Sequence, residues 1–326
     1  MSRKRLLYVV AALVVLSLAA FLATRWKDAP RSAQSIEFLL DWKMGAFFSP
    51  YLLADADGYY AAEGLSVTFT EGQGAETSAK LIGQAKYKVG TSNAAATAIA
   101  IDHGIPVLSV AMIEQSAVTA IFSLKKTGIQ VPADLIGKKL GVRYFDISHQ
   151  EYLAMMKAQK LDPGKVKEVS VGFDLQPLLT GQVDALYNYA YAMPVVLREQ
   201  GQEINIILVK DYGVNGYGSN IIANRSFAKN SSDALTRFLR ASRKGWVAAR
   251  ATPEKAIDVL KSRYPETDAK LALANLKEQL KWLESSGDAS LFSQTAERWN
   301  AVLDAYIALG LIKKRPQLSD VFSTAY

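Results

Sequence analysis

Short apolar runs alternate with segments of helical periodicity over most of this chain, and this rhythm limits the fold more than any other feature. The first apolar runs lie at residues 36–40, 65–69, 87–90 and 107–112, and the helical segments among them lie at 75–86 and 94–102. Strands that alternate with helices in this way are typical of a parallel sheet covered on both faces. The sequence therefore predicts an α/β fold.

A second block repeats the alternation and is followed by a purely helical tail. Its strands are expected at 117–124, 139–142, 166–171, 183–186 and 204–209, then a strand at 219–223 returns to the first block, and helices follow at 233–250, from 252, at 268–284 and at 292–309. This order predicts two lobes joined by two linking segments, with residues 36–117 and 220–326 in lobe 1 and residues 118–219 in lobe 2. A ligand is expected between the lobes, at the carboxyl ends of the strands.

The N-terminus carries a basic segment followed by a long uncharged one. Residues 2–5 read SRKR, and residues 6–24 contain no charge. This pattern is typical of a secretory signal, although the apolar stretch is nearly long enough to span a bilayer as an uncleaved anchor. Residues 1–33 are therefore expected to be a signal peptide or signal anchor plus a linker. Because the chain has no cysteine, a lipid-anchored lipoprotein is excluded.

Composition removes several functional classes. The absence of cysteine excludes disulfides, thiolate metal sites and cysteine nucleophiles. The net charge of +7 includes three basic residues at the N-terminus, and the body holds one basic run, at 313–315, so no nucleic-acid footprint is expected. Of the two histidines, His103 is predicted to end a helix ahead of Gly104, and His149 to be solvated. With no nucleophile-elbow, dinucleotide-loop or P-loop motif, no catalytic residue, metal or cofactor is predicted.

Polar and aromatic residues follow the predicted strands and form the candidate ligand site. In lobe 1 they are Asp41, Trp42, Phe47, Ser49, Gly72, Gln73, Gly74, Ser92, Asn93 and Gln115, and in lobe 2 they are Arg143, Tyr144, Asn188, Tyr189 and Tyr191. Aromatic rings supply stacking area, and the polar groups supply directed hydrogen bonds. The glycines are expected to let backbone N–H groups approach a ligand.

Several of these residues have an equally ordinary structural interpretation. Phe47 fits the packed face of the first helix, and Ser92 and Asn93 fit the capping of a helix N-terminus. Asp41 and Trp42 stand at the end of a strand, where the ligand interpretation is favoured.

Three segments carry a resemblance to a known family. They are LDW with SPY at 40–42 and 49–51, DGYYAAEGL with GQGA at 57–65 and 72–75, and LIGKKLGV at 135–142. The chain resembles the periplasmic substrate-binding proteins of the nitrate, sulfonate and thiamine-pyrimidine-precursor type. The resemblance implies a type II periplasmic-binding fold, a small-molecule ligand, an ABC transporter permease in the inner membrane as partner, and a monomer without catalysis.

The Asp41-Trp42 pair looks most like the thiamine-pyrimidine-precursor branch, which implies an aromatic heterocyclic ligand. Sulfonate, nitrate or another small organic solute is the alternative. A membrane-tethered sensor domain and a pyrimidine-synthesising enzyme on the same scaffold are further hypotheses. A fungal pyrimidine synthase of this family needs a cysteine-rich site, which this chain lacks.

Overall fold

The computed structural model describes residues 33–326, apart from 145, 146, 215 and 285–289. The signal or anchor predicted at residues 6–24 lies outside the described residues. Within the described part of the chain, no helix is both long enough and apolar enough to cross a bilayer.

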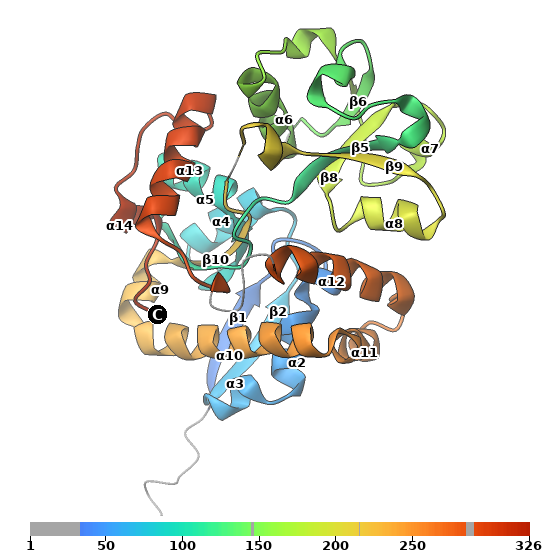
Figure 1. Ribbon diagram of the computed structural model, residues 1–326. Helices are drawn as coiled ribbons and strands as arrows, with labels where there is room; N and C mark the ends of the chain where they lie inside the picture. The colour runs from blue at the N-terminus through green and yellow to red at the C-terminus, as the bar shows by residue number, and fades with distance from the viewer. Residues whose placement is uncertain (1–32, 145–146, 215, 285–289) are drawn as a thin grey trace, which may run out of the picture. The chain divides into compact units, whose positions relative to one another are not determined.

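The first lobe is built on a five-stranded sheet with the order β2-β1-β3-β10-β4 (Figure 1). Its strands are β1 (Gln34–Leu39), β2 (Leu65–Thr70), β3 (Val89–Asn93), β4 (Val107–Met112) and β10 (Ser219–Asn224). Strand β10 enters the middle of this sheet, between β3 and β4, although it follows them by more than a hundred positions. The predicted return strand is thus part of the centre of the first sheet.

The second lobe is built on another five-stranded sheet with the order β7-β6-β8-β5-β9. Its strands are β5 (Thr119–Leu124), β6 (Lys139–Val142), β7 (Lys167–Ser170), β8 (Ala185–Tyr189) and β9 (Ile204–Leu208). The associated helices are η2 (Lys125–Thr127), η3 (Pro132–Leu135), α6 (Ile147–Ala158), η4 (Pro163–Lys165), α7 (Gln176–Leu179), α8 (Met193–Glu199) and η5 (Val209–Tyr212). The α/β two-lobed fold class predicted from the sequence is confirmed, while the residue boundaries given to the lobes stay a prediction.

Both sheets are mixed, so the parallel sheet expected from the alternation of strands and helices is present only in part. Strand β1 runs parallel to β3, but β10 runs antiparallel to both of its neighbours. In the second sheet, β5 likewise runs antiparallel to β8 and β9. Strand β5 is the first strand after the chain passes from the first sheet to the second, and β10 is the first strand after the chain passes back. A parallel pair needs a crossover connection, usually a helix, and the described residues show none between these strands and the neighbours they pair with antiparallel.

Two strand positions also differ from the sequence prediction. Strand β3 extends to Asn93 and β8 extends to Tyr189, so residues expected in loops lie in strands. Their ends are set by partners distant in sequence, because Asn93 pairs with Ser219 and Tyr189 pairs with Thr119. Strand pairing of this kind overrides the local apolar pattern.

Helices of the first lobe pack around its sheet. They are η1 (Ala46–Phe48), α2 (Ser49–Ala56), α3 (Tyr59–Ala62), α4 (Ala75–Gly83), α5 (Ala94–Asp102) and α9 (Arg225–Asn230). The side chain of Asn93 caps α5 by accepting from Ala96 N over 2.8 Å. His103 ends α5 just before Gly104, as predicted.

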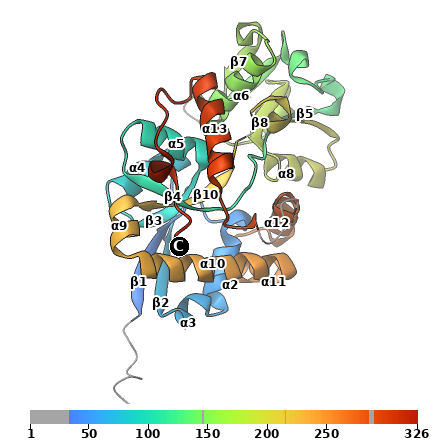
Figure 2. The same ribbon diagram turned by 60° about the vertical axis from the view of Figure 1, so that its left-hand side comes forward.

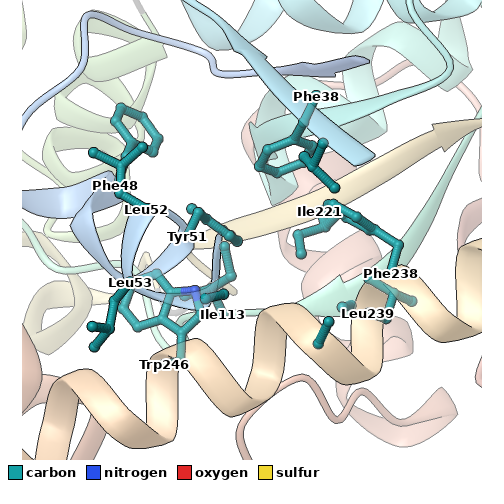
Figure 3. Close-up of a cluster of buried hydrophobic side chains, with 14 of the residues drawn as sticks. Phe38, Phe48, Tyr51, Leu52, Leu53, Ile113, Ile221, Phe238, Leu239 and Trp246 are labelled. Atoms are coloured by element: carbon teal, nitrogen blue, oxygen red, sulfur yellow. The ribbon is translucent and has the colours of Figure 1, made fainter. Parts of the chain in front are cut away.

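The helical tail consists of α10 (Ser232–Ala251), α11 (Pro253–Arg263), α12 (Ala269–Glu284), α13 (Ala296–Leu309) and α14 (Leu318–Val321). Trp246 of α10 packs edge-on against Tyr51 of α2, and Figure 3 shows the two rings together in the core of the first lobe. Figure 2 shows α13 and α14 beside α5. The predicted helical C-terminal region is confirmed.

Two tail helices also contact the second lobe. The Glu278 carboxylate of α12 lies 3.8 Å from the Arg198 guanidinium, and Lys270 Nζ of α12 lies 2.9 Å from the Glu199 carboxylate. Arg198 and Glu199 belong to α8. At the end of α13, the carbonyl of Ala308 accepts from Lys157 Nζ of α6 over 2.8 Å. The tail therefore connects the lobes at places separate from the two linking segments.

Candidate functional site

Asp41 lies just beyond the end of β1, where its carboxyl is tied to the neighbouring strand. Its backbone N–H donates to Thr91 Oγ1 over 2.7 Å, and Thr91 Oγ1 donates to Asp41 Oδ1 over 2.6 Å. Burial raises the pKa of Asp41, and the Thr91 hydrogen bond opposes that rise. The side chain is half-buried, so Asp41 is a positioned carboxyl that is partly withdrawn from water.

The loop after β2 packs on the Asp41 segment. Gly74 N donates to Asp41 O over 2.7 Å, and Gly72 N donates to Trp42 O over 3.3 Å. A Cβ atom at residue 72 would lie 2.1 Å from Leu40 O, so only glycine fits there. The expectation that these glycines offer free N–H groups to a ligand is therefore wrong, because both groups already bind protein carbonyls. Gln73 between them is exposed.

Aromatic rings from the two lobes meet beside Asp41. Phe47 of η1 stacks on Tyr191, which follows β8, with ring centroids 6.0 Å apart and planes 13° apart. Tyr189 stacks on the same ring at 5.3 Å. The charge of Asp41 contributes to the raised pKa of Tyr191, although burial is the main cause. Four of the predicted site residues, Asp41, Phe47, Tyr189 and Tyr191, are thus brought together.

Glu114 belongs to this cluster, although the sequence prediction selected its neighbour Gln115. The Glu114 side chain is 1% exposed, and its Oε2 accepts from Ser219 N over 3.0 Å. Within the described residues, its Oε1 is buried without a hydrogen-bond partner. Burial raises the pKa of Glu114 to about 7; the Ser219 N–H and the Tyr191 hydroxyl oppose the rise, and the Asp41 charge adds to it.

The backbone around Glu114 is the place where the two linking segments run side by side. Glu114 N donates to Ser219 O over 3.0 Å, and Ala117 N donates to Gly216 O over 2.9 Å. A Cβ atom at Gly218 would clash with Glu114 Oε2, 2.4 Å away, so a glycine is required to admit the carboxyl. Glu114 is therefore held rigidly where the chain passes between the lobes.

Trp42 contacts the second lobe through an exposed aromatic pair. The Trp42 ring centroid lies 4.8 Å from the ring centroid of Phe173 in the second lobe. The Arg143 guanidinium, also in the second lobe, lies 4.6 Å from the Phe173 ring centroid. Arg143 also donates to Tyr187 O over 3.3 Å. Trp42 and the unpredicted Phe173 thus form a contact between the lobes, and Arg143 packs on Phe173 within the second lobe.

The remaining predicted residues mostly serve the local structure. Ser49 Oγ donates to Ala46 O, Ser92 Oγ donates to Ala75 O, and Asn188 Oδ1 accepts from Tyr189 N. The Gln115 amide donates to the carbonyls of Ser290 and Ser293 in the tail. Tyr144 is exposed and packs on His149. These contacts favour the structural interpretation for this group.

The second lobe also buries a carboxylate that the sequence analysis did not select. Glu151 of α6 accepts from Thr119 Oγ1 over 2.9 Å and from Tyr187 OH over 2.5 Å. His149 is not solvated as expected: its side chain is largely buried, and its Nε2 lies 3.1 Å from Glu168 Oε2. The local pattern could not show this, because the partner carboxylate comes from β7.

A small pocket lies behind the Glu114 segment, and it is not large enough for a heterocycle. Its volume is about 10 Å³, room for a single water molecule. It is lined by Ile113, Gln115, Trp246, Arg250, Leu280, Leu283, Ser290 and Leu291. Among the described residues, no group of three or more potential metal ligands comes together.

Residues 46–256 match the model of the family described as NMT1/THI5 like. The chain belongs to this family. It is 25% identical over 325 residues to a formylaminopyrimidine-binding protein of Halalkalibacterium halodurans, an alignment that covers 97% of this chain and 98% of the relative. It is also 25% identical over 308 residues to the riboflavin-binding protein RibY of Chloroflexus aurantiacus, over 92% and 88% of the two chains.

Other relatives define the range of the family. A 4-amino-5-hydroxymethyl-2-methylpyrimidine phosphate synthase of Saccharomyces cerevisiae is 27% identical over 240 residues, 69% of this chain and 70% of the relative. Among solved structures, the periplasmic aliphatic sulphonate binding protein SsuA from Escherichia coli matches with a TM-score of 0.69 at 14% identity, over 89% and 91% of the chains. At that identity the structural likeness shows the shared fold alone.

Proposed function

We propose that this chain is the substrate-binding component of an ABC importer and that it captures an aromatic heterocycle between its two lobes. The observation that carries this proposal is the stacking of Phe47 on Tyr191, two rings from opposite lobes, near enough to Asp41 for its charge to raise the pKa of Tyr191. A ligand that contacts both lobes favours their closed arrangement, which a transporter can recognise. The two binding-protein relatives, one for formylaminopyrimidine and one for riboflavin, support the heterocycle.

The proposal places the protein outside the cytoplasm, with a permease in the inner membrane as its partner. Support comes from the basic and apolar N-terminal segments and from the periplasmic location in the name of the SsuA structure. We further propose that the protein acts as a monomer and that its N-terminal segment is a cleaved signal or a membrane anchor. Mass spectrometry of the mature N-terminus distinguishes the two, since cleavage leaves a new terminus near residues 20–30.

We propose that the protein binds its ligand without converting it, although one group of relatives consists of synthases. The chain has no cysteine, and its candidate site offers carboxyl and aromatic groups suited to stacking and hydrogen bonding. The ligand that co-purifies with the protein should be recovered chemically intact after prolonged incubation. A new product in the mass spectrum would contradict this part of the proposal.

The binding proposal is tested on protein purified without denaturation. Native mass spectrometry is expected to detect a co-purified heterocycle, and calorimetry is then run with that compound. Asp41→Ala and Tyr191→Ala should each weaken binding about tenfold or more, equivalent to about 1.4 kcal/mol. The control is Thr68→Val, because Thr68 is exposed on β2. Unchanged affinity in both site variants would overturn the site assignment.

A further inference from the structure

We propose that Glu114 determines the ligand specificity of this site: its free carboxylate oxygen accepts a hydrogen bond from an N–H group of the ligand. The expected solute is a neutral or cationic amino-substituted heteroaromatic ring, not an anion such as a sulfonate or nitrate. This inference rests on the proposed function, because it assigns the chemistry of the same ligand position.

The first argument is the unequal use of the two Glu114 oxygens. Oε2 accepts from the backbone of Ser219, whereas Oε1 is buried and has no partner within hydrogen-bond distance among the described residues, although the Tyr191 hydroxyl lies near enough to lower the pKa of the carboxyl. Buried polar atoms in folded proteins are nearly always satisfied by protein, water or ligand. An exposed carboxylate would satisfy this oxygen with water, but Glu114 is 1% exposed. The unsatisfied atom therefore indicates a position for a donor.

The second argument is where this carboxyl lies. Asp41 of the first lobe and Tyr191 of the second lobe both change the pKa of Glu114. Tyr191 and Phe47 also pack in one cluster with Val118, which follows Glu114 by four positions along the linking segment. A ring that stacks near Phe47 and Tyr191 would thus have a polar edge within reach of Glu114.

The third argument is the charge of the surroundings. The pKa values of Asp41 and Glu114 are changed mainly by burial, by hydroxyl or backbone donors and by other acids, and none of these influences is a cation. The nearby arginines are engaged elsewhere: Arg143 packs on Phe173, and Arg298 packs on Tyr217 and donates to Gln115 O. Tyr51, whose pKa the Asp41 charge also raises, is fully buried in the core. Within the described part of the chain, an anion at this position would meet these two acids, whereas N–H donors of a ligand are matched by them.

The rigid setting of Glu114 makes the site selective. The carboxyl is held by the Ser219 N–H and packed against Gly218, so turning away from a ligand that lacks a donor would break the hydrogen bond to Ser219. A site built to bind an N–H group rejects an analogue without it, because the buried acceptor is then left unpaired.

The test uses calorimetry with 4-amino-5-hydroxymethyl-2-methylpyrimidine and with its analogue that carries hydrogen in place of the amino group. The wild type should bind the amino compound and bind the analogue about tenfold more weakly or worse. Glu114→Gln keeps the shape and the acceptor for Ser219 but replaces Oε1 with a donor amide, and it should weaken binding of the amino compound by a similar factor. Glu37→Gln, at an exposed carboxyl that accepts from Thr70, is the matched control and should bind like the wild type.

The outcomes separate this inference from the function on which it rests. Equal binding of the two compounds by the wild type, or equal binding of the amino compound by wild type and Glu114→Gln, overturns the role of Glu114 and leaves heterocycle binding intact. Binding of methanesulfonate or nitrate in place of both pyrimidines overturns the proposed ligand class itself, and the inference with it. The comparison of the two compounds needs only the wild type, so it holds even if the variant does not fold.

Discussion

Glu114 and the Ser219 backbone are joined by two hydrogen bonds across the two segments that link the lobes, one to the Glu114 carboxyl and one from its backbone N–H. Ser219 N donates to Glu114 Oε2, and Glu114 N donates to Ser219 O, each over 3.0 Å. The charge on one side chain is thus coupled to the backbone at the passage between the lobes. We therefore expect the ligand-free protein to respond to pH near neutrality.

Stability of the ligand-free protein should fall as the pH rises through about 7, because burial raises the pKa of Glu114 from 4.5 to about 7. A carboxyl whose folded pKa is raised stabilises the fold below its unfolded pKa, and this contribution is lost as pH rises through the folded pKa. In Glu114→Gln, the free energy of unfolding should lose up to about 3 kcal/mol of its variation with pH. Urea unfolding of both proteins from pH 5 to pH 8 provides the comparison, and parallel curves would contradict it.

Gly72→Ala should destabilise the first lobe by about 1–3 kcal/mol, since the added Cβ would lie 2.1 Å from Leu40 O. The clash also displaces the backbone that leads into Asp41, so ligand affinity should fall with stability. Gly45→Ala is the matched control, because its backbone is extended and an added methyl group would find no atom within 4 Å. Thermal unfolding that ranks the two variants equally would argue against this close packing.

Thr119→Val should cost about 1.5–3 kcal/mol, the range for losing a hydrogen bond to a charged group, because Thr119 donates to the buried Glu151 carboxylate. The same replacement at Thr68, which is exposed on β2, should change stability by less than about 0.5 kcal/mol. Denaturant unfolding measures both. If the two variants were equally stable, Glu151 would not depend on the Thr119 hydroxyl.

The Trp42–Phe173 pair should contribute a measurable coupling between the lobes. A double-mutant cycle with Trp42→Leu and Phe173→Leu is expected to give about 0.5–1.5 kcal/mol, since the two rings lie 4.8 Å apart. A second cycle that pairs Trp42→Leu with Phe227→Leu on α9 should show additive effects. Additivity in both cycles would mean that the aromatic contact does not hold the lobes together in solution.

Local apolar pattern was sufficient to predict the strands, the helical tail and the return to the first sheet. It failed where a distant partner determines the outcome. Asn93 and Tyr189 were expected in loops, yet pairing with Ser219 and Thr119 places both in strands.

The candidate site shows the same limit. Asp41, Phe47 and Tyr191 were predicted because polar and aromatic types at strand ends are visible in sequence. Glu114 was passed over because its importance depends on burial and on Ser219, more than a hundred positions later. Phe173 lies after β7 in a segment without periodicity, so no local signal marks its contact with Trp42.

The central place of β10 in the first sheet has a consequence for how the chain folds. All strands of the second sheet lie between Thr119 and Leu208, whereas the first sheet is incomplete until Ser219–Asn224 arrives between β3 and β4. During synthesis, all strands of the second sheet are available before β10 has been made. Until then, the edges of β3 and β4 that pair with β10 have no partner strand. Long-range closure of this kind slows folding, so the first sheet should be the later of the two to form.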